Sequence, residues 1–166
     1  FLADRGAEVL GIIPHDPYLR YVRTDEIARR LGGRTLTSAE PRIVRHFVVS
    51  ASGIESSLRS FRRTPEFAVI TGGDQAEIHL AALEVPELRC LVLTGDQRPS
   101  RDVVDRAADA GVPVILAGQN TLATANLCSG MLDRFWVVPG EPLEYAVDHV
   151  RTNIDVDRIL EKARDR

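Results

Sequence analysis

Short apolar runs alternate with helix-length amphipathic segments through the second half of the chain. Each run is followed by a small, polar, glycine-containing turn. This alternation is typical of parallel βαβ units, and strands without interior polar positions indicate a sheet covered on both faces. The fold class that follows is α/β, with a mostly parallel β-sheet and helices on both faces. The predicted strands are Phe67–Thr71, Arg89–Thr94 and Pro113–Ala117, and the predicted helices are Gln75–Glu84, Arg101–Ala110 and Thr121–Met131.

The first part of the chain has a less regular pattern. Glu8–Ile13 is an apolar run followed by Pro14, and it predicts a buried strand. Arg34–Thr37 predicts a short extended segment, and Ile43–Ser50 predicts a further strand. The change of rhythm near residues 33–42 is the one place where the sequence indicates a domain boundary.

Capping residues predict where several helices begin. Thr24 is expected to cap a helix that carries Asp25 and Glu26 in its first turn. Ser52 and Glu55 form a capping box, in which each side chain binds a free backbone N–H. At the other end of the chain, Phe135–Val138 predicts a last strand, Pro142 opens a helix that reaches about Asn153, and Asp155–Arg166 predicts a second, exposed helix.

The composition is that of an ordinary globular domain, and it narrows the expected partners. The 166 residues are 44% hydrophobic and 27% charged, with a formal net charge of −3. No apolar run reaches the ~18 residues of a membrane span, and the basic residues form no nucleic-acid-binding cluster. Cys90 and Cys128 have no CxxC spacing, which indicates buried, reduced thiols. The sequence therefore predicts a cytoplasmic protein that binds neither nucleic acid nor membrane.

Three small polar loops follow the three predicted parallel strands. Ligands of open parallel sheets bind at the carboxyl ends of the strands, so these loops should lie side by side and form a binding site. The predicted ligand-binding residues are Thr71, Gly72, Gly73, Asp74, Thr94, Gly95, Asp96, Asn120 and Thr121.

Each loop also has a purely structural interpretation. Gly72 and Gly73 suit a sharp turn from strand to helix. Asp74 with Glu77 forms an acidic capping box, and a carboxylate on the free N–H groups would compete with a bound phosphate. Asp96 suits a surface turn, and a third interpretation has Asp74 and Asp96 hold a cation through water.

Motifs of catalysis are absent from the sequence. It contains no GxxxxGK[ST], GxGxxG, HExxH or GxSxG. The histidines share no metal-ligand spacing, and each is interpreted as structural or surface-exposed; they are His15, His46, His79 and His149. We therefore predict no catalytic residue, no metal site and no cofactor.

The stretch from Ala68 to Thr124 resembles the DRTGG domain family. It carries "TGGDQ" after the first strand, then "CLVLTG", then "GVPV" and a threonine-containing loop, in the family's order. The family commonly has arginine where this chain has Gln75, so an anion contact at that position is not implied. The resemblance implies a fold similar to the amino-terminal domain of HPr kinase, which is non-catalytic. It also implies a regulatory role, because DRTGG domains occur beside CBS domains that often sense adenine nucleotides.

The residues before this stretch carry a second resemblance. "GAEVLGIIPHDPYLRYVRTDEIARRLGG" is similar to the segment that follows the dethiobiotin-synthetase-like P-loop domain in long bacterial phosphotransacetylases and their stand-alone relatives. The resemblance implies two parts: residues 1–38, a trailing segment packed on the main domain, and residues 39–166, the DRTGG domain with a C-terminal helical segment. Since the chain starts at Phe1, we expect it to be cut from a longer protein and tethered to a P-loop domain there.

Three functions remain open at this point. The first is a non-catalytic module that senses a small metabolite or nucleotide, mediates homodimerisation, or does both. The second is a pure interaction module, with a dimer face on the exposed side of Ile78–Leu83 or on Leu143–Leu160. The third is an enzyme of the phosphate acetyltransferase family.

Overall fold

The computed structural model describes residues 8–50, 53–132 and 141–164. They belong to two compact units. One runs from Arg20 to Phe135, and the other combines Phe1–Leu19 with Trp136–Arg166. Residues 20–38, which the resemblance assigns to a trailing segment, lie in the larger unit together with the DRTGG-like stretch. The kinship of residues 1–38 with a dethiobiotin-synthetase-like domain stays a prediction.

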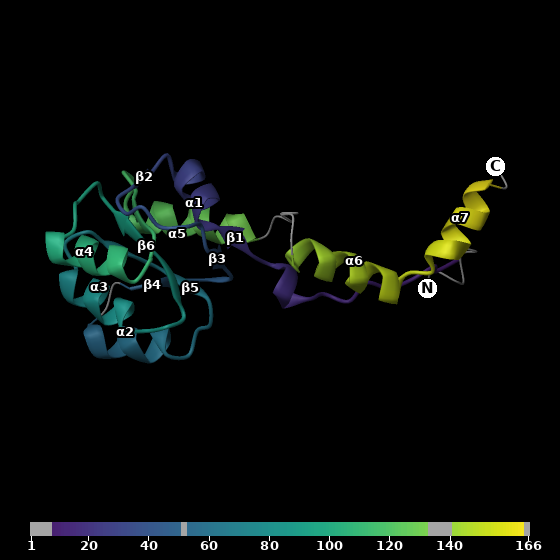
Figure 1. The fold of residues 1–166 in the computed structure, drawn as a ribbon, viewed down its shortest axis with the longest axis horizontal. Coiled ribbons are helices and arrows are strands. Elements are labelled where there is room, and N and C mark those ends of the chain that lie inside the picture. The colour runs from purple at the N-terminus through teal and green to yellow at the C-terminus, as the bar shows by residue number, and fades with distance from the viewer. Residues whose placement is uncertain (1–7, 51–52, 133–140, 165–166) are drawn as a thin grey trace. The chain divides into compact units, whose positions relative to one another are not determined.

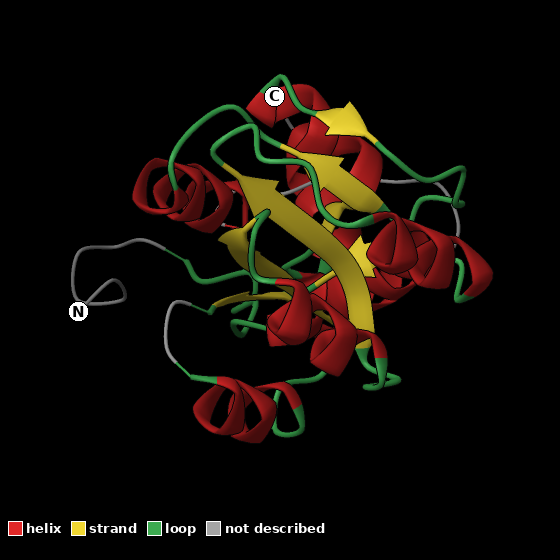
Figure 2. Ribbon diagram, turned by 90° about the vertical axis from the view of Figure 1, so that its left-hand side faces the viewer, coloured by secondary structure: helices red, strands yellow, loops and turns green. Residues whose placement is uncertain are grey.

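A five-stranded, mostly parallel sheet forms the centre of the larger unit (Figure 2). Its strand order is β2-β7-β6-β5-β4, and only β2 runs antiparallel, against β7. Along β5 and β6 the register pairs Gly72 with Thr94, so the carboxyl ends of these two strands are level. The strands are β2 (Arg34–Thr35), β4 (His46–Val49), β5 (Phe67–Gly72), β6 (Leu88–Thr94) and β7 (Val114–Leu116).

Helices cover both faces of this sheet, as the apolar strands predict. Figure 1 shows α2, α3 and α4 on one side and α1 and α5 on the other. Successive residues of β5 point to opposite faces of the sheet. Val69 packs in the apolar cluster between the sheet and α2–α4, and Ile70 packs in the cluster between the sheet and α1 and α5. The helices are α1 (Thr24–Leu31), α2 (Ile54–Phe61), α3 (Ala76–Leu83), α4 (Arg101–Asp109) and α5 (Thr121–Leu132).

The predicted strand Ile43–Ser50 is divided into two short strands. β3 (Ile43–Val44) pairs with β1 (Val22–Arg23) in a separate two-stranded sheet, and β4 joins the main sheet. Between them, the backbone N–H of Arg45 donates to the carbonyl of Glu66, 2.8 Å away. One apolar run thus pairs with two different neighbours, which its sequence alone does not indicate.

The predicted cap of the first helix is wrong. Helix α1 begins at Thr24 itself, and its N-cap is Arg23, which makes no side-chain cap hydrogen bond. Thr24 is buried, and its Oγ1 accepts the backbone N–H of Arg42 at 3.0 Å, so the hydroxyl serves a tertiary contact instead. Asp25 and Glu26 do lie in the first turn. The predicted cap at Ser52 lies outside the described residues.

The predicted strand Glu8–Ile13 is also wrong. Among the described residues, its only β-type backbone pairing is an isolated bridge between Gly11 and Ile154. Val9, Ile12 and Ile13 remain 48–75% exposed. An apolar run becomes a strand only where another strand offers backbone partners, and this segment is assigned to the smaller unit, whereas the sheet belongs to the larger one.

The smaller unit is helical. It contains a 3₁₀ turn, η2 (Pro17–Leu19), and the helices α6 (Glu141–Asn153) and α7 (Val156–Arg164). Both C-terminal helices were expected from the sequence, and the residues of α7 are all exposed, as predicted. The predicted strand Phe135–Val138 lies outside the described residues. Among the helices that the structure describes, none has the length and apolar character needed to cross a membrane.

Candidate functional site

A cavity of about 410 Å³ lies at the carboxyl ends of the central strands. The loops after β5, β6 and β7 all contribute to it, as expected for an open parallel sheet. Of the predicted site residues, only Gly73 and Asp96 do not line it. The lining residues are Ser50, Thr71, Gly72, Asp74, Gln75, Thr94, Gly95, Gln97, Asn120 and Thr121.

Threonine hydroxyls tie the strand ends to helix α5. Thr94 Oγ1 donates to the backbone carbonyl of Thr71 at 3.2 Å and lies 2.8 Å from Thr121 Oγ1. Because the single proton of Thr94 goes to that carbonyl, Thr121 is the donor in the second hydrogen bond. The first residue of α5 is thereby fixed against the end of β6.

Asn120 caps the N-terminus of helix α5 at the edge of the cavity. Its Oδ1 accepts the backbone N–H of Ala123 at 2.9 Å, and its carbonyl accepts that of Thr124 at 3.0 Å. This is the ordinary geometry of an asparagine N-cap. The side-chain oxygen of Asn120 is therefore engaged, and its amide N–H₂ group is the part that remains to meet a ligand.

The two glycines of the first loop permit a close approach between loops. A Cβ on Gly73 would lie 1.7 Å from the carbonyl oxygen of Gln97, so the β5 and β6 loops touch through backbone there. A Cβ on Gly72 would lie 2.5 Å from Asp74 Oδ1. Gly73 therefore permits the two loops to pass close together beside the cavity, although it does not line the cavity itself.

Asp74 does not cap helix α3, so the predicted acidic capping box is wrong. The helix begins at Ala76, and its N-cap is Gln75, without a side-chain cap hydrogen bond. A tight turn precedes it, closed by the N–H of Gln75 on the carbonyl of Gly72 at 3.2 Å. Asp74 lies inside this turn, one residue too early to cap, and its exposed carboxylate lines the cavity instead.

Asp96 lies in a surface turn beside the cavity. Its φ is +53°, and its N–H donates to the carbonyl of Ala117 at 3.0 Å. The carboxylate is 67% exposed and pairs with Arg34 at 3.2 Å. In the described part of the chain, no three His, Cys, Asp or Glu side chains gather as metal ligands would. Asp74 therefore lines the cavity, whereas Asp96 lies beside it and pairs with Arg34.

Two buried polar side chains lie behind the strand ends. His79 of α3 donates from Nε2 to the carbonyl of Gly72 at 2.9 Å, and its burial lowers its pKa. Its Nδ1 has no hydrogen-bond partner among the described residues, and neither does Oγ1 of Thr71. His79 is thus a structural histidine, as expected, and its neutral form holds the Gly72 turn.

The described residues hold no arrangement typical of nucleophilic catalysis. Burial raises the pKa of both cysteine thiols, that of Cys128 to about 12, so neither is a thiolate at neutral pH. In the cavity, Ser50 Oγ lies 2.6 Å from Ser57 Oγ, a hydroxyl pair with no base in it.

Three lining residues were missed from the sequence: Ser50, Gln75 and Gln97. Gln75 and Gln97 each follow a predicted residue directly, so extending each loop by one position would have found them. Ser50 ends the predicted strand Ile43–Ser50, and its polar side chain at a strand end was a usable signal.

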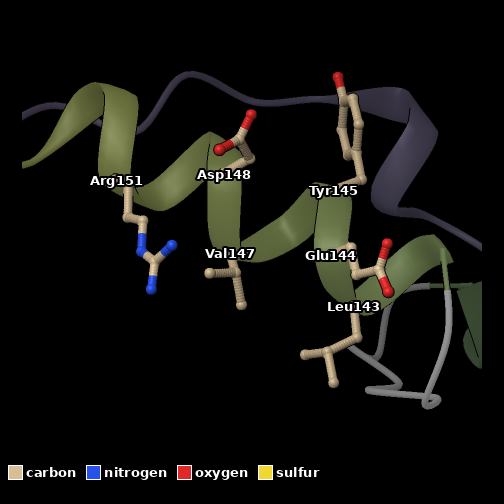
Figure 3. Close-up of a pocket in the computed structure, with 6 residues that line it drawn as sticks. All are labelled: Leu143, Glu144, Tyr145, Val147, Asp148 and Arg151. Carbon is tan, nitrogen blue, oxygen red and sulfur yellow. The ribbon is translucent and has the colours of Figure 1, made fainter.

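A second concavity, of about 660 Å³, belongs to the smaller unit. Figure 3 shows that its labelled residues all project from helix α6, from Leu143 to Arg151. Tyr145 donates to Asp16, which raises the pKa of the tyrosine and lowers that of the carboxyl. One helix supplies all of these residues, so this surface lacks the convergent loops of the strand-end cavity.

Comparison with known proteins relates the chain to one family. The DRTGG domain model matches residues 26–131. A phosphate acetyltransferase of Pseudomonas putida is 28% identical over an alignment of 156 residues that covers 89% of this chain but only 22% of that enzyme. The CBS and DRTGG domains of the regulatory region of Clostridium perfringens pyrophosphatase, complexed with the activator diadenosine tetraphosphate, superpose with a TM-score of 0.55 at 20% identity. That superposition covers 79% of this chain and 66% of the other.

The family match extends over more than half of the chain and includes β5, β6, β7 and the loops of the cavity. The structural likeness independently supports the same α/β fold. The resemblance carried by "TGGDQ", "CLVLTG" and "GVPV" is thereby confirmed: this chain belongs to the DRTGG domain family.

Proposed function

We propose that this chain is a non-catalytic regulatory module that senses a small polar metabolite or nucleotide in the strand-end cavity. The observation that carries the proposal is the cavity itself, which three loops of the sheet build from hydroxyl, amide and glycine residues. At about 410 Å³ it lies within the size range of small-molecule sites. Its described lining offers hydrogen bonds but no nucleophile with a base, which suits binding rather than turnover.

The relatives support a regulatory setting. The solved pyrophosphatase relative is a regulatory region in complex with an activator, and the acetyltransferase relative is more than four times as long as the aligned segment. We infer that this chain works inside a larger phosphotransacetylase-like or P-loop-containing cytoplasmic protein. Ligand binding in the cavity would then change the activity of a neighbouring domain.

A thermal-shift series tests the sensor. The compounds are adenine nucleotides, coenzyme A, acetyl phosphate, pyruvate and divalent cations. A specific ligand at a hundred times its Kd stabilises the folded state by about 2.7 kcal/mol. We expect a saturable shift that Gln97→Trp abolishes, because that side chain lines the cavity. Asp96→Ala is the matched control, since Asp96 is adjacent and does not line it. A shift lost only in Asp96→Ala would contradict the proposed location.

The similarity to a phosphate acetyltransferase raises an alternative to the sensor function, namely that this chain is itself an enzyme. We expect no turnover of acetyl phosphate with coenzyme A by this chain. The assay follows acetyl-coenzyme A formation at high protein concentration, with Gln97→Trp in parallel. Turnover that the cavity variant removes would overturn the non-catalytic assignment.

Exposed apolar side chains favour homodimerisation through the smaller unit as a second candidate function. Helices α6 and α7 leave six large apolar side chains 38–51% exposed: Tyr145, Val147, Val150, Val156, Ile159 and Leu160. The alternative face on α3 does not fit, because Ile78 and Ala82 are buried and Leu80 and Leu83 pack against the core. Sedimentation velocity on the wild type and on Ile159→Glu tests this: a dimer should become a monomer, and a monomeric wild type would exclude it.

A further inference from the structure

The described lining of the strand-end cavity carries negative charge and no positive charge. Asp74 is the single ionisable residue in its described lining, and no arginine, lysine or histidine faces it there. Arg34, on the neighbouring edge strand, is held by Asp96 at 3.2 Å outside the cavity. A bound anion would therefore meet a carboxylate without a compensating cation, which is unfavourable.

The hydrogen-bonding groups that remain free point to the same conclusion. The hydroxyls of Ser50, Thr94 and Thr121 already form hydrogen bonds within the protein. The side-chain oxygen of Asn120 accepts a hydrogen bond from the first turn of α5. The carboxylate of Asp74 remains as an acceptor-only group without a hydrogen bond in the described structure. Thr71 adds a fully buried hydroxyl whose Oγ1 lacks a partner in the residues described. Such a hydroxyl is rare in a folded protein unless a ligand or water satisfies it.

The start of helix α3 offers free backbone N–H groups, which elsewhere bind phosphate. Here the first turn carries Glu77, and Asp74 lies just before the helix. The two acids already place negative charge at the positive end of the helix dipole. A phosphate at this point would be repelled by both.

We propose that the cavity binds an uncharged, hydroxyl-rich group, namely the vicinal hydroxyls of a sugar or of a nucleoside ribose. This inference rests on the proposed sensor function and names the ligand chemistry of the same site. Asp74 accepts hydroxyl protons from the ligand, as carboxylates do for ribose in dinucleotide sites, and Thr71 adds a hydrogen bond at the strand end. The amides of Gln75 and Gln97 supply further donors and acceptors around the cavity.

Isothermal titration calorimetry with four probes tests the inference: adenosine, D-ribose, AMP and orthophosphate. We expect adenosine to bind more tightly than AMP, and orthophosphate not to bind measurably. Asp74→Asn should weaken adenosine binding about tenfold, the usual contribution of a hydrogen bond to a charged group. It should weaken AMP binding less, because the substitution also removes the repulsion between the carboxylate and the phosphate. Glu77→Gln, which removes a neighbouring charge outside the cavity, is the matched control and should leave adenosine affinity unchanged.

The probes also distinguish a sugar ligand from a nucleoside ligand, and a wrong ligand class from a wrong sensor function. D-ribose binding as tightly as adenosine indicates a sugar ligand, and adenosine alone indicates a nucleoside. AMP or orthophosphate binding more tightly than adenosine overturns the ligand class but leaves a sensor at this site. Adenosine affinity that survives Asp74→Asn overturns the role of Asp74. If none of the probes binds and no compound of the thermal-shift series shifts the melting temperature, both the ligand assignment and the sensor function are refuted.

Discussion

Gly73 lies where the loop after β5 passes closest to the loop after β6. An alanine Cβ at this position would lie 1.7 Å from the carbonyl oxygen of Gln97, and a backbone carbonyl cannot rotate away as a side chain can. We expect Gly73→Ala to lower the free energy of unfolding by about 1–3 kcal/mol, in the range of overpacked sites, and to distort the cavity. Urea denaturation monitored by circular dichroism measures the loss.

Gly118 provides the matched control for this prediction. It also follows a strand at the same edge of the sheet, yet nothing lies within 4 Å of an added Cβ. Gly118→Ala should stay within about 0.5 kcal/mol of the wild type, as surface substitutions usually do. Equal stability losses in the two variants would show that the approach of the two loops is not what requires glycine at Gly73.

His79 makes stability depend on pH. Its burial lowers its pKa in the folded state below the unfolded value near 6.5. Above that value the imidazole is neutral in both states, so its contribution is fully present. As the pH falls below 6.5, the unfolded chain takes up the proton more readily, and the free energy of unfolding must decrease, by at most about 1.4 kcal/mol per pH unit.

The measurement is urea denaturation between pH 7.5 and pH 5. We expect His79→Gln to flatten the decline, because glutamine can still donate to the Gly72 carbonyl but does not titrate in this range. A His79→Gln variant with an unchanged slope would contradict the assignment.

At the scale of elements, Thr37 extends the pairing of β2 with β7. Its Oγ1 donates to the carbonyl of Val112 and accepts the N–H of Val114, both at 3.0 Å, and the residue is buried. Thr37→Val preserves the shape but leaves both backbone groups without this partner. We expect a loss of about 2–3 kcal/mol in the free energy of unfolding. Thr35→Val, at an exposed position of β2, should change the free energy of unfolding little, and chemical denaturation of both variants distinguishes them.

The regular elements were predictable because their signals are local. Buried strands such as Phe67–Gly72 are short apolar runs that end in glycine turns, and their helices follow at once. Glu8–Ile13 has the same apolar signal, but among the described residues it forms only one isolated bridge, because a strand also needs a neighbour that its own residues do not encode. Thr24 failed as a cap for a related reason, since its hydroxyl bonds to Arg42, 18 residues away.

The candidate site was predictable to the extent that it follows from parallel topology. Three consecutive strands place their carboxyl ends at one edge, which brings Thr71, Thr94 and Thr121 together. Asp96 could not be separated from them in advance, because its partner Arg34 lies 62 residues earlier on an antiparallel edge strand. Asp74 could not be assigned either, since the tight Gly72–Gln75 turn decides between capping and lining.

At the scale of the whole molecule, the two units differ in what stabilises them. Every buried apolar residue of the described chain lies between Tyr21 and Met131, within the larger unit. The described contacts of the smaller unit are ring contacts of Tyr145 with Tyr18 and His149, its hydrogen bond to Asp16, and the ion pairs of Glu8 with Arg158 and Lys162, among others. Exposed ion pairs contribute little to stability, so we expect the larger unit to be the part that folds cooperatively by itself.

A chain of residues 20–135 tests this expectation. It retains the whole described core, so it should unfold in one cooperative transition with a Tm within a few degrees of the full chain, because about 1 kcal/mol shifts the Tm of such a domain by only ~4 °C. A chain of residues 33–135 is the control: it lacks α1 and β1, whose Val22, Ile27 and Leu31 are buried in the core. That deletion opens one face of the sheet and should remove cooperative unfolding. If residues 20–135 also lose their sharp transition, the smaller unit contributes to the stability of the larger one, and the cavity should then be studied only in the full chain. If they keep it, the strand-end cavity can be titrated in the shorter chain, without the exposed apolar surface of α6 and α7.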